Sequence, residues 1–167
     1  MPADDPLIDG LRMREVLGHY PTGVAIVTAP GAGEEPPVGM AVGSFTSVSL
    51  DPPLVGFFVD HRSSTWPLIE AAGRFCANVV GAHQEDLCRL FAMKGIDRFA
   101  SCGWQPGLSG APRLDDAVAW IDCRVDQVVP TGDHWLVLGR VLELDLPAEH
   151  RSPLVFHRGG YGGVARL

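Results

Sequence analysis

The chain has 167 residues, of which 46% are hydrophobic and 20% charged, as expected for one compact domain, residues 1–167, with a sizeable core. Its formal net charge of −7 argues against nucleic acid and anionic membranes as partners, because both require clustered Lys and Arg. No apolar run approaches the roughly 20 residues needed to cross a bilayer. Residues 1–5 are acidic and lack the features of a secretory signal, so we expect a cytoplasmic protein.

The cysteines and histidines predict neither a metal site nor a redox pair. Cys76, Cys88, Cys102 and Cys123 are too far apart in the sequence for a zinc knuckle or a Cys-x-x-Cys motif. The histidines show no two-ligand spacing on one element. We therefore expect reduced, mostly buried cysteines and no bound metal.

The first part of the chain predicts a leading helix followed by short strands. Apolar residues recur at near-helical spacing over 7–17, and the β-branched run at 24–28 predicts a strand. The Gly- and Pro-rich residues 30–37 predict a hairpin connection to a returning strand at 38–43. The side chains of residues 45–50 alternate between two faces, which predicts a further strand.

The middle of the chain predicts two strands, each followed by a helix. The apolar run 54–59 predicts a strand that is buried on both faces, and 75–80 predicts another. A short helix begins after the capping residues 63–65, with Pro67 in its first turn. A second helix, at 84–93, carries apolar residues on its inner face: Leu87, Leu90 and Phe91.

The last part of the chain predicts mainly strands. Residues 94–115 show no clear hydrophobic periodicity. We interpret them as a long ordered connecting segment, called the excursion below. Strands are expected from 120 to 126, from 134 to 146 after a turn at Gly132 and Asp133, and at 154–156, followed by a Gly-rich tail at 158–163. The pattern predicts a mainly β protein, an antiparallel Greek-key barrel with a few short helices. Because no Gly-x-Gly-x-x-Gly follows the first strand, a Rossmann domain is disfavoured.

The order of several short motifs resembles the flavin reductase-like family, which has the FMN-binding split barrel. Each motif alone is weak, but they run in family order over most of the chain. The motifs are Pro-Thr-Gly-Val at 21–24, Gly-Met-Ala-Val-Gly-Ser-Phe-Thr-Ser-Val-Ser at 39–49, Asp-Pro-Pro-Leu at 51–54, Ser-Ser-Thr at 63–65, Phe-Cys-Ala-Asn-Val at 75–79, Gly-Asp-His at 132–134 and His-Arg-Gly-Gly-Tyr at 157–161.

The resemblance implies an NAD(P)H:flavin oxidoreductase that reduces FAD or FMN with NADH, or with NADPH, by hydride transfer. It also implies a homodimer with the flavin near the subunit interface. Many members of the family are the small component of a two-component monooxygenase and supply reduced flavin to a separate oxygenase. Since hydride transfer uses the reactivity of the two cofactors, the protein needs only to align their rings, and the lack of a catalytic triad is expected.

By resemblance, two strands line the flavin ring and ribityl chain. The small residues at 39–44 would let the backbone approach the ring closely. The ordinary alternative is that both segments are simply barrel strands, and for the side chains of Phe57 and Phe58 we favour the core. The residues assigned to this wall are Gly39, Met40, Ala41, Val42, Gly43, Ser44 and Phe45, with Phe57, Phe58 and Val59.

The flavin phosphate is assigned to the start of the first internal helix, where hydroxyl and N–H groups converge: Ser63, Ser64 and Thr65, with added charge from Arg62. Helix capping accounts for one of these hydroxyls but not for three. Arg89 and Lys94 flank the end of the next helix near Phe91, which is included in the site. Both cations are placed to reach the same phosphate or an FAD pyrophosphate, or else lie on a solvated helix face.

The nicotinamide face is assigned to the segment after the last strand. There the glycines allow a turn that brings His157 and Tyr161 towards the flavin, with Arg158 and Gly159 beside a dinucleotide phosphate. The alternative is an unstructured basic tail. His134 matches the Gly-Asp-His motif and is a candidate redox residue, although a lone histidine is more often a structural hydrogen-bonding group.

Two other functions fit parts of the sequence. One is an enzyme with permanently bound FMN, either an oxidase or a deazaflavin-type reductase, which would stay yellow on dialysis and fail to reduce free flavin. The other is a non-catalytic flavin- or haem-binding barrel, which would consume no NADH. The His157–Tyr161 segment argues against the second, because a binding module needs no nicotinamide face. No motif distinguishes FAD from FMN.

Overall fold

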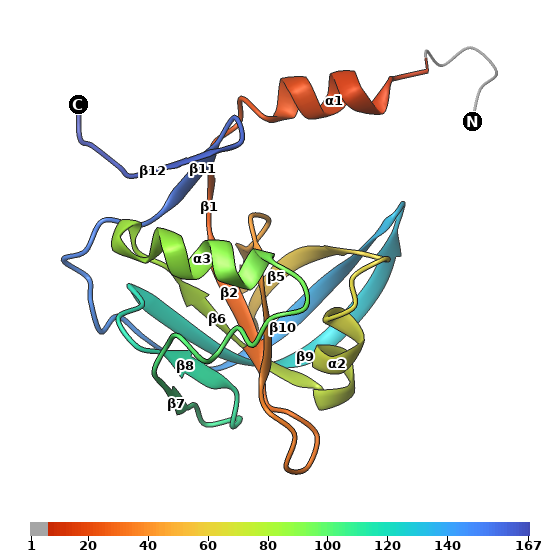
Figure 1. Cartoon of the computed structure of the whole chain (residues 1–167). Helices are drawn as coiled ribbons and strands as arrows, with labels where there is room; N and C mark the ends of the chain where they lie inside the picture. The colour runs from red at the N-terminus through yellow and green to blue at the C-terminus, as the bar shows by residue number, and fades with distance from the viewer. Residues whose placement is uncertain (1–6) are drawn as a thin grey trace.

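The computed structural model describes residues 7–167, and antiparallel strands dominate this part of the chain (Figure 1). The prediction about residues 1–5 lies outside the described residues. The helices are α1 (Gly10–Leu17), α2 (Trp66–Ala72) and α3 (Glu85–Ala92), and a 3-10 turn, η1 (Ala82–Gln84), precedes α3. In the described chain, no helix combines the length and apolar character that a membrane crossing requires.

The strands form one large sheet and two small ones. The strands are β1 (Thr22–Gly23), β2 (Ala25–Ala29), β3 (Val38–Val42), β4 (Thr46–Leu50), β5 (Pro53–Asp60), β6 (Arg74–Val79), β7 (Trp104–Pro106), β8 (Pro112–Leu114), β9 (Ala119–Thr131), β10 (His134–Asp145), β11 (Val155–His157) and β12 (Gly160–Gly162). The large sheet has seven antiparallel strands in the order β3-β2-β6-β9-β10-β5-β4. It curls so that β3 and β5 approach each other, which confirms the mainly β barrel with non-sequential strand order.

Aromatic side chains fill the centre of the barrel. The rings of Phe57 on β5 and Phe75 on β6 are both fully buried, and their centroids are 5.3 Å apart in an edge-to-face arrangement. Trp66, the first residue of α2, packs edge-on against Phe57 at 6.1 Å. Because α2 begins with this buried ring, the core fixes the position of the loop that precedes the helix.

A second apolar cluster attaches α3 to the outside of the barrel. Cys88 and Phe91 on α3 are buried against Ile26 on β2 and against Val80 and Leu154. The prediction placed Leu87, Leu90 and Phe91 on the inner face, but Cys88 is buried more deeply than the two leucines, which are half-buried. α3 also lies against β3 (Figure 1).

The predicted excursion at 94–115 contains a hairpin of β7 and β8 that sequence periodicity did not reveal. Buried polar groups fix it to the large sheet. The backbone N–H of Leu114 donates to Asn78 Oδ1 at 2.8 Å, and the hydroxyl of Thr28 donates to the carbonyl of Pro112 at 2.5 Å. This contact network orders the excursion although its own residues show no repeating pattern.

Two predictions about strands were wrong in part. The tail expected at 158–163 is instead the second half of a hairpin, in which β12 pairs with β11 and β11 pairs with β1. The turn uses positive φ angles at Arg158 (51°) and Gly159 (77°). The strand at 54–59 is not buried on both faces, because Phe58 remains 40% exposed.

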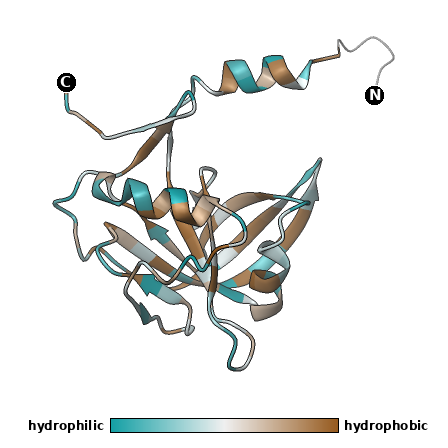
Figure 2. Ribbon diagram, in the orientation of Figure 1, coloured by the Kyte–Doolittle hydropathy of each residue, from teal (hydrophilic) through white to brown (hydrophobic). Residues whose placement is uncertain are grey.

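The leading helix α1 is present, but the part of the chain that the structure describes buries none of its residues. It has no buried residue, and it projects from the barrel beside the small β1-β11-β12 sheet (Figure 1). Apolar residues are distributed along it, as the brown segments of Figure 2 show: Leu11, Met13, Val16 and Leu17, all more than half exposed. A helix of this kind gains little stability in isolation.

Candidate functional site

A cavity of about 710 Å³ lies where β3 faces the end of β5. This volume falls within the range usual for sites that bind small molecules. Its walls come from four segments of the chain, and they include most of the residues that the resemblance assigns to flavin. The lining residues are Met40, Ala41, Val42, Gly43 and Ser44; Phe58, Val59, Asp60 and Arg62; Ser63, Ser64 and Thr65; and Phe91, Ala92, Lys94 and Arg98.

The edge position of β3 leaves backbone polar groups available to a ligand. β3 pairs with β2 on one side only, so alternate N–H and C=O groups on its other side have no strand partner. Ser44, just after β3, joins the two walls. Its hydroxyl accepts from the N–H of Phe58 at 2.9 Å and donates to the carbonyl of Phe58 at 3.1 Å. These bonds fix the spacing between β3 and β5.

Apolar side chains from β3 and β5 face the cavity next to these backbone groups. Phe58 lines it, so the expectation that its side chain belongs to the core was wrong. The expectation was right for Phe57, whose ring is fully buried in the barrel and does not line the cavity. Phe45 likewise packs against the barrel core.

The glycines at 39 and 43 also leave room for side chains of the protein itself. A Cβ on Gly39 would lie 2.8 Å from Cε1 of Phe91, and a Cβ on Gly43 would lie 3.2 Å from Oγ1 of Thr22. Protein side chains therefore occupy the space that these glycines leave, and no cofactor is needed to explain either residue. Gly39 allows Phe91 to pack closely on β3.

Hydroxyl groups gather at one end of the cavity. The hydroxyl of Ser63, two residues before the N-cap Thr65, accepts from the N–H of Trp66 at the start of α2, at 3.1 Å. The hydroxyl of Thr65 accepts from Nη1 of Arg98 at 3.2 Å, and Ser64 is exposed. This hydrogen bond thus occupies Ser63, whereas Ser64 and Thr65 face a ligand-sized space beside a guanidinium.

The two arginines assigned to the phosphate are already paired with carboxylates. Nη2 of Arg62 lies 2.8 Å from Oδ2 of Asp60, and hydrogen bonds from Arg62 hold the pKa of Asp60 well below its ordinary value. Nη2 of Arg89 lies 2.6 Å from Oε1 of Glu85, outside the cavity lining. Each of these two arginines therefore already has a carboxylate partner within the protein.

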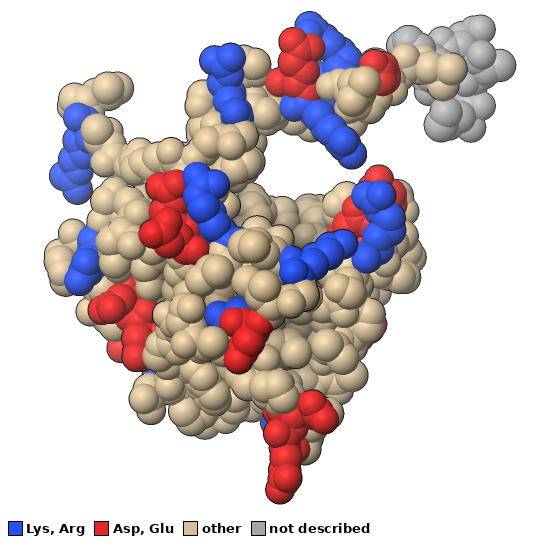
Figure 3. All heavy atoms as spheres, in the orientation of Figure 1, with Lys and Arg blue, Asp and Glu red and all other residues tan. Residues whose placement is uncertain are grey.

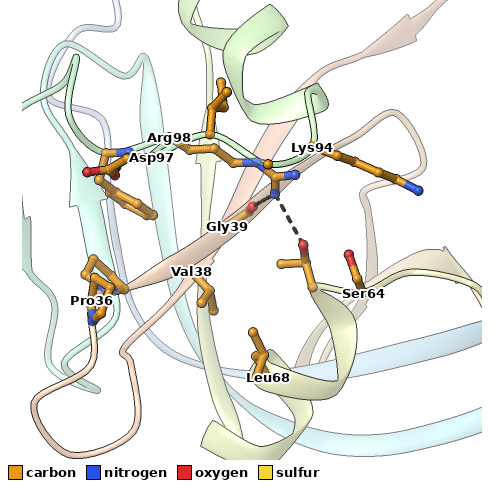
Figure 4. A pocket seen from close by; sticks show the side chains of 13 residues that line it. Pro36, Val38, Gly39, Ser64, Leu68, Lys94, Asp97 and Arg98 are labelled. Carbon is orange, nitrogen blue, oxygen red and sulfur yellow. Dashed lines mark hydrogen bonds between the residues drawn. The ribbon is translucent and has the colours of Figure 1, made fainter.

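Arg98 and Lys94 instead carry the uncompensated charge. Among residues 7–167, no carboxylate lies within ion-pair distance of either side chain. The guanidinium of Arg98 donates to the carbonyl of Gly39 and the hydroxyl of Thr65 (Figure 4). It also donates to the carbonyl of Met93, and burial lowers the pKa of Arg98. In Figure 4 the side chain of Asp97 points away from it, and Asp97 Oδ1 accepts from the N–H of Phe99 at 3.1 Å.

Sequence reasoning missed Arg98 because it lies in the aperiodic excursion. It noted Lys94 but only as one of two cations near the helix end. The signal available in the sequence was that Lys94 and Arg98 are four residues apart and follow directly after a predicted helix. Across the face drawn in Figure 3, basic side chains are scattered between wide uncharged areas and do not form one broad patch.

The residues assigned to the nicotinamide face do not line the cavity in this chain. Tyr161 is half-buried behind α3, where its hydroxyl is 3.5 Å from Sγ of Cys88 and its ring lies under Arg89 at 4.7 Å. Burial is the main reason that the pKa of Tyr161 rises to about 12. His157 is exposed on β11, with its ring centroid 6.4 Å from that of His19.

The other residues of this group lie at edges of the molecule. Arg158 and Gly159 form the β11–β12 turn, where the N–H of Arg158 donates to the carbonyl of Gly18 at 2.9 Å. His134 pairs across the sheet with Asp60, which lines the cavity, while His134 Nδ1 lies 2.6 Å from Oδ1 of Asp133. One chain therefore assembles the predicted flavin wall but not the predicted nicotinamide face.

Comparisons with known proteins agree on one family. The model of the flavin reductase like domain matches residues 17–165. A flavin reductase of Pseudomonas putida is 49% identical over 160 residues, covering 96% of this chain and 93% of that protein. The reductase subunit HsaB of a flavin-dependent monooxygenase from Mycobacterium tuberculosis is 42% identical over 158 residues, covering 94% of this chain and 83% of that one.

Solved structures extend this agreement to the fold. The NADH:FAD oxidoreductase SgcE6 of Streptomyces globisporus, solved with NAD and FAD fragments, superposes with a TM-score of 0.87. It is 36% identical, and the match covers 96% of this chain and 98% of that one. The predicted split-barrel fold and the predicted enzyme class, an NAD(P)H-dependent flavin oxidoreductase, are confirmed. The chain belongs to the flavin reductase-like domain family.

Proposed function

We propose that this protein reduces free FAD or FMN with NADH, or with NADPH, and releases the reduced flavin to a separate monooxygenase. One observation carries the proposal: the cavity between β3 and β5 combines an apolar wall and free strand-edge groups with a cationic, hydroxyl-bearing end. A flavin nucleotide has groups in a matching arrangement, with a flat ring at one end and a phosphate at the other. The names of the relatives support the same reaction.

The residues of the cavity fit both ends of such a molecule. Unpaired N–H and C=O groups along β3 suit the donors and acceptors on the edge of the ring. The apolar residues Met40, Phe58 and Val59 line the space for one of its faces and leave the other face to the nicotinamide. Ser64, Thr65, Lys94 and Arg98 suit the phosphate, because charge-assisted hydrogen bonds are the strongest kind available. When bound, the flavin supplies the acceptor for the hydride of the nicotinamide.

The protein has no proton to move in the transfer itself and acts by alignment. For His134, His157 and Tyr161 we propose roles at the nicotinamide face, as the family resemblance implies. For His134, support comes from its pairing with Asp60 at the cavity rim. For His157 and Tyr161, the role requires the hairpin of a partner subunit.

A homodimer is therefore part of the proposal. The exposed apolar residues of α1 and its projection away from the barrel support a second copy as the surface that covers it. The substitution Val16→Glu should produce a monomer in sedimentation velocity, while Arg14→Glu on the same helix should leave a dimer. A wild-type protein that sediments as a monomer would contradict the proposed homodimer.

We also propose a cytoplasmic location for the protein.

The central experiment adds FAD, FMN and riboflavin in turn to the purified protein and follows oxidation of NADH and NADPH by absorbance. We expect a flavin-dependent rate with a protein that is colourless after dialysis. A protein that stays yellow and does not turn over added flavin would instead be one with permanently bound FMN. Flavin binding with no consumption of either nicotinamide would identify a non-catalytic barrel.

A further inference from the structure

The apolar wall of the cavity between β3 and β5 contains a thioether. Among the described residues that line this cavity, only Met40 carries sulfur. Met40 is 8% exposed, whereas Met13 and Met93 are 54% and 51% exposed, so its sulfur is shielded from bulk solvent but borders the cavity. A leucine would give an equally apolar wall. Because peroxides convert a thioether to a sulfoxide, Met40 brings an oxidisable atom to the place where flavin is reduced.

Hydrogen bonds define the surroundings of this sulfur. The N–H of Trp66 donates to the hydroxyl oxygen of Ser63 at 3.1 Å, and the same hydroxyl donates to Sδ of Met40 at 3.8 Å. Ser63 also lines the cavity, so the sulfur lies where two lining residues meet. A thioether sulfur has two lone pairs, and one donor leaves the other free to attack an electrophilic oxygen. The Ser63 hydroxyl can then donate to the oxygen of the resulting sulfoxide.

We propose that Met40 is a site of reversible oxidation, where hydrogen peroxide formed in the cavity converts the thioether to a sulfoxide. The inference rests on the proposed function, which supplies reduced flavin next to Met40. When no oxygenase removes that flavin, dioxygen takes two electrons and one proton from it and a second proton from water, which gives oxidised flavin and hydrogen peroxide. One peroxide oxygen then bonds to Sδ while the O–O bond breaks, and the other oxygen leaves as water.

Oxidation of Met40 lowers the activity of the protein. The side chain packs against the barrel core as well as lining the cavity, and the sulfoxide makes it polar. A polar oxygen in this apolar wall raises the Kd for FMN about tenfold. Flavin reduction therefore slows when reduced flavin is not carried away, and a methionine sulfoxide reductase reverses the change.

The test compares two sources of peroxide by peptide mass spectrometry, which detects a sulfoxide as a gain of about 16 Da. In one sample the protein oxidises NADH with FMN in air, with catalase in the solution. In the other, hydrogen peroxide is added without NADH or catalase. We expect oxidation of Met40 to exceed that of Met13 and Met93 about fivefold or more in the first sample, because catalase cannot enter the cavity. In the second sample the two exposed methionines should be oxidised first.

The effect on turnover is measured in the same reaction. The wild-type rate should fall during turnover in air and recover after treatment with methionine sulfoxide reductases of both stereospecificities. Met40→Leu should keep its own starting rate, whatever that rate is. Met93→Leu is the matched control and should lose activity as the wild type does, because Met93 does not line the cavity.

Three results would count against the inference, and a fourth against the proposed function. Consumption of NADH without a sulfoxide at Met40, or a sulfoxide that catalase prevents, would show that no peroxide acts within the cavity. An equal loss of rate in Met40→Leu and wild type would show that oxidation of Met40 does not control turnover, and so would a loss that the reductases fail to reverse. If no NADH is consumed with any flavin, the proposed function itself is wrong.

Discussion

The guanidinium of Arg98 donates to the hydroxyl of Thr65, with 3.2 Å between Nη1 and Oγ1, although the two residues are 33 positions apart in the chain. The same guanidinium donates to the carbonyls of Gly39 and Met93. Three neutral acceptors orient Arg98 without neutralising it, since uncharged oxygens compensate little of its charge. It is thus held at the end of the cavity as a cation available to an anion.

We predict that Arg98→Ala weakens binding of FMN but not of riboflavin, which lacks the phosphate. Losing one charge-assisted contact costs about 1.5–3 kcal/mol, so the Kd for FMN should rise about 10- to 100-fold. Arg98→Lys keeps the charge and should fall between wild type and Arg98→Ala. Calorimetric titration with both flavins measures the difference.

Arg62→Ala provides the comparison, because the pairing of Arg62 with Asp60 leaves less charge for a ligand. We expect its effect on the Kd for FMN to be smaller than that of Arg98→Ala. Equal losses for FMN and riboflavin in Arg98→Ala would show that Arg98 supports the fold of the cavity and does not contact the phosphate.

We predict that Gly39→Ala destabilises the protein because the added Cβ would lie 2.8 Å from Cε1 of Phe91. Displacing a packed ring costs about 1–3 kcal/mol, which urea unfolding can measure. Since Phe91 also lines the cavity, FMN binding should weaken as well. Gly23→Ala is the matched control, because no atom lies within 4 Å of the Cβ position there. Equal unfolding midpoints for the two variants would contradict the packing argument.

The strand patterns predicted β3 and β5, and the family resemblance assigned residues of both strands to one site, where the structure places many of them around one cavity. Residues 40–44 and 63–65 all line the cavity as expected. The cations expected to bind the phosphate were predicted less well, because Arg62 and Arg89 were assigned from their position along the chain and without their carboxylate partners. Their carboxylate partners Asp60 and Glu85 also lie nearby in sequence, so the pairing could have been anticipated from the spacing.

Other features could not be predicted from local patterns. Arg98 is held at the site by hydrogen bonds to Gly39 and Thr65, which are distant from it in the sequence, so no local pattern reveals its position. The glycines at 158–163 suggested a tail, whereas pairing with β1 makes them a hairpin. Phe58 alternates with Phe57 along β5, but only the barrel geometry shows which of the two faces the cavity.

We predict that the folded protein resists alkylation by iodoacetamide near pH ~8, since the thiolate is the reactive form. Burial raises the pKa of Cys123 to about 12, and burial also raises the pKa of the Cys76 thiol. The half-buried Cys102 should react first, and Cys102→Ser should remove most of the early labelling. Intact-mass spectrometry over time measures this, with urea-unfolded protein as the fully labelled reference. Rapid labelling of Cys76 or Cys123 in the native protein would contradict the burial that the fold shows.

We predict that Asn78→Leu destabilises the protein and loosens the β7–β8 hairpin. Asn78 is fully buried, with Oδ1 accepting from the N–H of Leu114 at 2.8 Å and Nδ2 donating to the carbonyl of Ile26 at 3.1 Å. Leucine keeps the volume but leaves the buried N–H of Leu114 without a partner, which costs about 1–3 kcal/mol. Urea unfolding measures the loss.

The matched control is Gln127→Leu, which removes an amide of the same kind from an exposed position on β9 and should leave the unfolding midpoint nearly unchanged. Because the hairpin orders the excursion that carries Arg98, Asn78→Leu should also raise the Kd for FMN more than that for riboflavin. Proteolysis within 94–115 should become faster in the same variant. Unchanged stability together with unchanged cleavage would mean that the hairpin does not depend on this buried amide, and that Arg98 is positioned by its contacts with Gly39, Thr65 and Met93 alone.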